Sequence, residues 1–167
     1  MVKITGGSYR LCVVRTDPLR NTDQHLIREH EIATTDLLEE NFFELVGRPC
    51  GPFQLTISTI GHRFNLHVAT IDGTPIISHF LSFTPLLRLM RDYAEICAVL
   101  RSASLQGNLH RIEAVDMARR GIHNEASELL AERLCGKINM DLPTARRLFT
   151  LVFIVWISKG PLIGLRY

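Results

Sequence analysis

Several widely used catalytic and nucleotide-binding motifs are missing from this sequence of 167 residues. It contains no GxxxxGKS/T, GxGxxG or GxSxG pattern, and its histidines show neither HxH nor HExxH spacing. These motifs build phosphate-binding loops, nucleophile elbows and zinc sites, so their absence argues against the common nucleotide-binding, hydrolase and metalloprotease mechanisms. Less common arrangements of catalytic or binding side chains are not excluded by these absences.

Cysteine is scarce and scattered, with single residues at Cys12, Cys50, Cys97 and Cys135 and no CxxC pair. The first residues, MVKITGGSYR, contain no apolar segment of the kind found in secretory signals. Together these features predict reduced thiols in a cytoplasmic protein, not a disulfide framework or a zinc cluster. We expect no metal and no cofactor.

A run of apolar residues long enough to span a membrane is also absent. The most apolar stretch, LFTLVFIVWI at 148–157, is about half as long as a transmembrane helix of about 20 residues. This stretch predicts a buried core helix, and no membrane span is expected.

Lysine is rare, and charge of one sign does not dominate. The formal net charge is +2, and lysine occurs only at Lys3, Lys137 and Lys159, so arginine supplies nearly all of the positive charge. Arginine suits phosphate and carboxylate recognition, although genomic base composition can produce the same bias. The small net charge and the glutamates interleaved with the arginines argue against nucleic-acid binding.

The pattern of apolar residues predicts one α+β domain over 1–167, with an extended C-terminal tail at 158–167. The composition, 46% hydrophobic and 22% charged, is ordinary for a globular protein of this size. Alternating apolar and polar residues predict an antiparallel sheet of three or four strands, packed against three to four helices. The expected strands are 53–59, 63–71 and 76–83, with 9–14 as a candidate fourth.

Helices are expected between and after these strands. The first begins at Thr22 or Asp23, either of which can cap it. A second is expected over 84–103, with Thr84 as N-cap and Pro85 in the first turn. A third covers 109–135 and ends at Gly136, and a fourth begins near 141 and contains the long apolar run.

The helix at 109–135 concentrates polar chemistry, most of it in DMARRGIHNEASELLAERL at 116–134. Residues spaced by three or four share a helix face. One face is expected to carry Glu113, Asp116, Arg120, His123 and Ser127, flanked by Arg119, Asn124, Glu128 and Glu132. The opposite face carries a core stripe of Ile112, Val115, Ile122, Ala126 and Leu129.

Two interpretations of this polar face stay open. His123 could act as a general base oriented by Glu113 or Asp116, beside arginines that bind an anion. Alternatively, the face is solvated and held by weak ion pairs. A glycine in the middle of a helix lowers the stability of that helix, so Gly121 is expected to have a specific role. A close helix crossing, a kink or access for a ligand to the backbone would each provide one.

Two further features are candidates for binding. Arg146 and Arg147 lie in the first turns of the last helix, where they could bind a phosphate or pair with glutamates of the preceding helix. His67 and His79 lie on neighbouring strands and could meet across the sheet, although no metal-binding spacing supports a metal site.

Several stretches together resemble a known bacterial family. They are DLLEEN at 36–41, GPFQLTIS at 51–58, LSFTPLLRLMRDYAEIC at 81–97, IEAVDMARRGIHNEASELLAERL at 112–134 and GKINMDLPTARRLFTL at 136–151. In order and content they are similar to uncharacterised protein family 0262, an alphaproteobacterial family, over roughly 8–160. The resemblance implies a cytoplasmic protein and assigns no activity and no catalytic residue.

The family motif is matched here by Arg119, Arg120, His123, Asn124, Glu125 and Glu128. The chain departs from the family near its end, where relatives have a His-Trp pair and this sequence has Val155 before Trp156.

Two classes of function follow from these observations. The first is a small interaction or regulatory protein that binds a protein partner or a second copy through the polar helix face or the tail. The alternative is an enzyme or a small-ligand (anion) binder that uses the polar helix face around Arg120 and His123.

Overall fold

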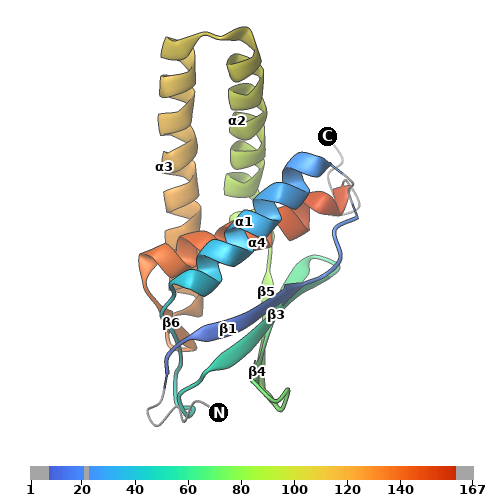
Figure 1. The fold of residues 1–167 in the computed structure, drawn as a ribbon, viewed down its shortest axis with the longest axis vertical. Helices are drawn as coiled ribbons and strands as arrows, with labels where there is room; N and C mark the ends of the chain where they lie inside the picture. The colour runs from blue at the N-terminus through green and yellow to red at the C-terminus, as the bar shows by residue number, and fades with distance from the viewer. Residues whose placement is uncertain (1–7, 21–22, 161–167) are drawn as a thin grey trace.

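The computed structural model describes residues 8–20 and 23–160, in which helices pack on one face of a four-stranded sheet (Figure 1). This arrangement confirms the α+β class. In chain order the elements are β1 (Leu11–Thr16), α1 (Gln24–Glu39), β2 (Phe43–Leu45), β3 (Phe53–Ile60), β4 (Arg63–Thr70), β5 (Pro75–Ser82), the 3-10 turn η1 (Thr84–Leu86), α2 (Leu87–Gln106), α3 (Leu109–Leu134), β6 (Ile138–Met140) and α4 (Leu142–Ser158).

The main sheet has the strand order β1-β3-β4-β5. β3, β4 and β5 form the predicted antiparallel meander. β1, however, pairs parallel to β3, so the expectation of a wholly antiparallel sheet was wrong at this edge. A parallel pair requires a long crossover, which α1 supplies between the two strands. β2 and β6 form a separate antiparallel pair that the hydropathy pattern did not reveal.

α1 and α4 cross the same face of the sheet and cover the core (Figure 1). The inward residues of β3 and β4 alternate as expected and are fully buried: Phe53, Leu55, Ile57, Phe64, Leu66 and Val68. The apolar run at 148–157 forms most of α4 and is buried, as predicted. No helix within 8–20 and 23–160 is both long and apolar enough to cross a membrane.

α2 and α3 form an antiparallel helical hairpin that projects away from the sheet (Figure 1). The predicted start of α2 was wrong, because the chain makes a 3-10 turn first and the Thr84 hydroxyl accepts a hydrogen bond from the Ser82 hydroxyl instead of capping a helix. Gly121 is exposed, and no atom lies within 4 Å of the position a Cβ would take, so a close helix crossing does not explain it.

The helix caps follow local chemistry. Asp23 caps α1 by accepting from the backbone N–H of His25, and Asp141 caps α4 by accepting from that of Thr144. Thr22, the other candidate cap of α1, and residues 161–167 of the predicted tail lie outside the described residues.

Asn41 connects the end of α1 to the edge of the sheet. Its side chain accepts from the Leu11 backbone N–H at 2.8 Å and donates to the carbonyl oxygens of Leu11 and Leu37 at 3.0 and 2.8 Å. The next residue donates its backbone N–H to the buried Thr144 hydroxyl of α4. The segment 41–42 therefore fixes the positions of β1, α1 and α4 relative to one another.

We expect Asn41→Ala to lower the free energy of unfolding by about 2–3 kcal/mol, because three hydrogen bonds are lost and their backbone partners are left half-buried. Urea denaturation followed by circular dichroism measures the change.

Asn139→Ala is the matched control, since Asn139 makes one exposed hydrogen bond to Glu44, and we expect a change within about 0.5 kcal/mol. Equal losses in the two variants would contradict the connecting role of Asn41.

Candidate functional site

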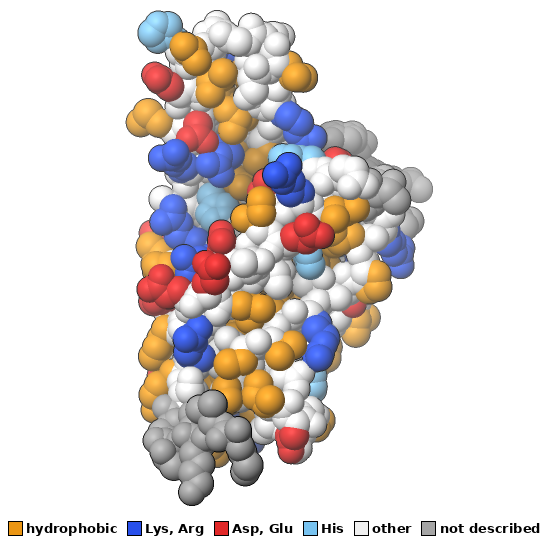
Figure 2. All heavy atoms as spheres, viewed as in Figure 1, with side chains coloured by type: hydrophobic (Ala, Val, Ile, Leu, Met, Phe, Trp, Pro, Cys, Tyr) orange, Lys and Arg blue, Asp and Glu red, His pale blue; other side chains and the backbone are white. Residues whose placement is uncertain are grey.

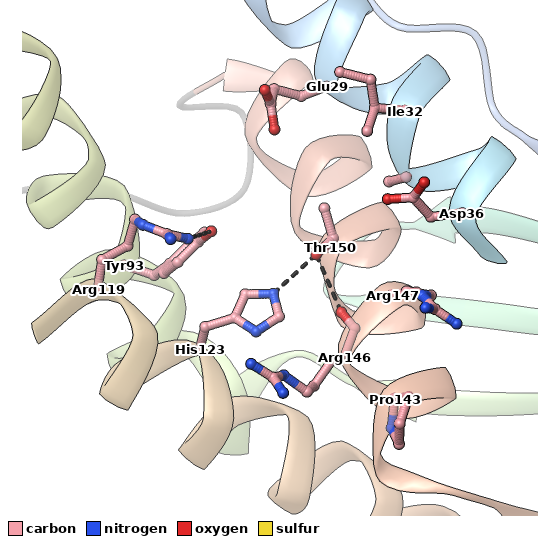
Figure 3. Close-up of a pocket in the computed structure, with 11 residues that line it drawn as sticks. Glu29, Ile32, Asp36, Tyr93, Arg119, His123, Pro143, Arg146, Arg147 and Thr150 are labelled. Carbon is pink, nitrogen blue, oxygen red and sulfur yellow. Dashed lines mark hydrogen bonds between the residues drawn. The ribbon is translucent and has the colours of Figure 1, made fainter. Parts of the chain in front are cut away.

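A cavity of about 320 Å³ lies between α1, α3 and α4, with Tyr93 of α2 at one end (Figure 3). Positions three, four or seven apart share one face of a helix, so helical spacing determines which side chains of each helix line the cavity. The lining residues are Glu29, Ile32, Ala33 and Asp36 of α1, Tyr93 of α2, Arg119 and His123 of α3, and Pro143, Arg146, Arg147 and Thr150 of α4.

Arg119 is held in place by two partners. Its guanidinium donates to the Asp116 carboxylate at 2.9 Å and approaches the Tyr93 hydroxyl at 3.5 Å. The other carboxylate oxygen of Asp116 lies 2.9 Å from Nε of Arg120. The hydrogen bond from Arg119, together with the positive charge of both arginines, lowers the pKa of Asp116. Asp116 therefore orients arginines and does not contact His123.

His123 is largely buried between aromatic rings. Its ring centroid lies 5.4 Å from that of Tyr93 and 5.2 Å from that of Phe149, and its Nε2 is 2.8 Å from the Thr150 hydroxyl. Burial lowers the pKa of His123 from 6.5 to about 4, and the charges of Arg146 and Arg119 act in the same direction. The imidazole is therefore neutral at pH 7.

The hydrogen bonds around His123 also indicate its tautomer. The Thr150 hydroxyl donates to the Arg146 carbonyl, so it accepts from Nε2–H of His123. The Ser127 hydroxyl donates to the His123 carbonyl at 2.6 Å and lies 3.4 Å from Nδ1. The side chain thus joins α3 to α4 through hydrogen bonds and ring contacts.

Arg146 and Arg147 present their side chains to the same cavity. Nη1 of Arg147 donates to the Glu40 carbonyl at 2.6 Å, which ties α4 to the end of α1. Arg146 is exposed and forms no ion pair with any residue in the described part of the chain. Neither arginine makes the ion pair with a glutamate of α3 that was the alternative to anion binding.

The structure brings together four of the residues suspected from sequence: Arg119, His123, Arg146 and Arg147. The remaining candidates do not line the cavity. They are Glu113, Asp116, Arg120, Asn124, Glu125 and Glu128. Glu125 pairs instead with Arg88 of α2 at 3.5 Å, and Oδ1 of Asn124 is buried without a hydrogen-bond partner in the described structure.

The predicted solvent-facing row on α3 was wrong for two of its members. Ser127 is fully buried and His123 is largely buried, because α4 packs against this side of the helix. The core stripe was also shifted, since Ala126, Leu130 and Leu134 are buried whereas Ile112 and Val115 remain partly exposed. The row therefore separates into a buried half near α4 and an exposed half along the hairpin.

The residues suspected from sequence did not include four that line the cavity: Glu29, Asp36, Tyr93 and Thr150. The spacing of Glu29 and Asp36, seven residues apart, would place them on one face of α1. Nothing in the sequence indicates that this face is opposite Arg119 and Arg146.

The register of the sheet separates the two histidines that sequence placed near each other. His67 lies opposite Ser78 and hydrogen-bonds its hydroxyl at 2.8 Å, whereas His79 lies opposite the buried Leu66. Neighbouring positions on a strand point to opposite faces, so the two imidazoles do not meet. Within the described residues, no group of three His, Cys, Asp or Glu side chains could hold a metal ion.

Besides the carboxylates of Glu29 and Asp36 on the α1 side, the cavity combines three guanidinium groups, two hydroxyls and a neutral imidazole. Such a set can bind a carboxylate or a phosphate through charge-assisted hydrogen bonds. Nucleophilic or general-base catalysis would require a base oriented by a second group, but the closest polar partners of His123 are the hydroxyls of Thr150 and Ser127. Val155 is buried in α4 and does not line the cavity.

We expect the neutral state of His123 to make stability depend on pH. Its pKa is about 4 in the folded protein and near 6.5 when unfolded, so the unfolded chain binds the extra proton first. Stability is fully present above pH 6.5 and is lost as pH falls toward 4. At pH 5 the loss attributable to His123 is on the order of 2 kcal/mol.

The measurement is the free energy of unfolding at pH 7 and pH 5 for wild type and His123→Gln, with His110→Gln, an exposed position on the same helix, as the control for losing an imidazole. The drop between the two pH values should be smaller in His123→Gln. An equal drop in wild type and His123→Gln would show that the imidazole is not held neutral.

Comparison with known proteins places the chain in a family. Residues 9–158 match the model of "Uncharacterised protein family (UPF0262)". A UPF0262 protein of Rhizobium meliloti is 44% identical over 148 residues, covering 88% of this chain and 94% of the relative. A UPF0262 protein of Methylobacterium radiotolerans is 45% identical, covering 88% and 92%.

A third relative, a UPF0262 protein of Agrobacterium fabrum, is 41% identical over 154 residues and covers 92% of this chain and 98% of its own length. All three come from alphaproteobacteria. No solved structure shows significant similarity to this chain. The family match and these relatives, each aligned over nearly its whole length, show that the chain belongs to UPF0262, a family whose function is uncharacterised.

Proposed function

We propose that this protein binds a small anionic ligand, carrying a phosphate or a carboxylate, in the cavity between α1, α3 and α4. The observation that carries the proposal is the convergence of three arginines from two helices on one open cavity, with Arg146 unpaired within the described residues. An unpaired guanidinium beside two others is electrostatically unfavourable, and an anion relieves that cost.

The arrangement suits recognition of oxygen-rich anions. Arg119 is preorganised by Asp116 and Tyr93, so little side-chain entropy is lost when it binds. The neutral His123 adds no further positive charge beside Arg146, and it holds Thr150 at the cavity wall. We propose a binding role for His123, in place of the general-base role that Glu113 or Asp116 would have supported.

We further propose that the protein binds this ligand in the cytoplasm. All four cysteines are free thiols, and three of them are exposed. Exposed thiols persist in reducing compartments and are rare in secreted proteins.

A second candidate function, binding of a protein partner or of a second copy, is favoured by the outer part of the α2–α3 hairpin. Figure 2 shows hydrophobic side chains at its upper end. Leu105 and Leu109, on either side of the tip, are 87% and 73% exposed, and Met117 is 75% exposed. Large apolar side chains exposed on a projecting element are available to contact a partner.

Arg146→Gln tests the anion site. We expect inorganic phosphate to bind about tenfold more weakly than to wild type in isothermal titration calorimetry at low ionic strength, because a charge-assisted contact is lost. Arg120→Gln is the control, since Arg120 is an exposed arginine of α3 outside the cavity. If Arg120→Gln weakens binding more than Arg146→Gln, the ligand binds along the polar face of α3 and the cavity proposal fails.

A photoreactive amino acid at position 105 tests the hairpin surface. We expect irradiation of cells to produce a covalent adduct of defined mass, identified by mass spectrometry as a partner or as a second copy of the chain. The same group at Ile71, an exposed apolar residue in the turn after β4, is the control. Adducts of equal yield at both positions, or none at position 105, would count against a partner at the hairpin tip.

A further inference from the structure

The cavity carries charges of opposite sign on its two sides. Glu29 and Asp36 lie on the face of α1 that borders the cavity, and Arg119 and Arg146 lie on α3 and α4 (Figure 3). Glu29 and Asp36 are exposed, and neither forms an ion pair with a residue in 8–20 or 23–160. The two carboxylates therefore face the arginines without neutralising them.

The surface between the two charged sides is apolar. Ile32 and Ala33 lie between Glu29 and Asp36 on α1, and Pro143 lies at the start of α4. Seven residues of helix separate the two carboxylates by about 10 Å along the axis, so each can act on a different part of a ligand. An aliphatic segment can contact this surface while charged groups at its ends reach opposite sides.

The charge pattern discriminates between classes of ligand. A purely anionic ligand bound to the arginines is repelled by Glu29 and Asp36, and a purely cationic ligand is repelled by the arginines. A molecule with an anionic group at one end and an ammonium group at the other satisfies both sides at once. The volume of about 320 Å³ is at the lower end of the usual range for ligand sites, which favours a small molecule.

Building on the proposed anion site, we infer that the ligand is a small zwitterion: a phosphate or carboxylate joined by a short aliphatic chain to a primary ammonium group. The anionic group binds Arg119 and Arg146 beside the Thr150 hydroxyl, and the ammonium group lies toward Glu29 and Asp36. Ile32 contacts the aliphatic chain.

Matched probes separate this inference from anion binding in general. Phosphoethanolamine and ethyl phosphate share a phosphate monoester and differ by the ammonium group, and 4-aminobutanoate and butanoate form the corresponding carboxylate pair. Affinities are measured by isothermal titration calorimetry at low ionic strength for wild type, Glu29→Gln/Asp36→Asn and Arg146→Gln.

Glu31→Gln/Glu39→Gln is the matched control, since it removes the same charge from exposed positions of α1 that do not line the cavity. All the substituted carboxylates are exposed, so circular dichroism should show an unchanged fold.

We expect wild type to prefer the zwitterion over its anionic counterpart by at least about threefold in one of the pairs, as one partly solvated charge contact allows. In Glu29→Gln/Asp36→Asn this preference disappears, with weaker binding of the zwitterion and equal or tighter binding of the simple anion. The control double variant keeps the preference, and Arg146→Gln weakens both members of the pair.

Two results overturn the inference and leave the anion site standing: equal affinity of wild type for the two members of each bound pair, or a preference that survives in Glu29→Gln/Asp36→Asn. If wild type binds none of the four probes, or if Arg146→Gln changes no affinity, the proposed function fails and the inference fails with it.

Discussion

The packing of the sheet and of the other helices follows from the need to bury α4. This helix is apolar on almost every side, so it can be stable only if other elements cover it all round. Its buried residues are Thr144, Ala145, Leu148, Phe149, Leu151, Val152, Phe153, Ile154, Val155, Trp156 and Ser158. The sheet covers one side, α1 a second and the α2–α3 hairpin a third (Figure 1).

The cavity is a consequence of this packing. The first turns of α4 are its polar part, and they carry Arg146, Arg147 and Thr150 where α1 and α3 flank the helix. His123 and Tyr93 close the inner end through ring contacts with Phe149. Charged side chains of both signs gather where the hairpin meets α1 and α4 (Figure 2).

The two candidate surfaces share one pair of helices. Tyr93 and Arg119 belong to the part of the α2–α3 hairpin next to α4, and Leu105 and Leu109 lie at its tip. Asp116 lies between these regions, and its ion pair with Arg119 orients the arginine toward the cavity. Ligand binding at one end of the hairpin and partner binding at the other would therefore act on the same rigid element.

Local chemistry was enough to predict the meander, the helix over 109–135 and the buried run in α4, because alternation, caps and glycine stops act within a few residues. The same signals did not show that β1 pairs parallel to β3, since strand pairing depends on the path of α1 between them. They also placed His123 and Ser127 on a solvated face, whereas α4 buries both. Helical spacing shows which side chains share a face, but a neighbouring element determines whether that face meets solvent, a core or a ligand. For this reason the sequence was enough to identify Arg119, His123, Arg146 and Arg147 as candidate site residues. Only the packing of three helices that are far apart in the chain places these side chains opposite Glu29 and Asp36.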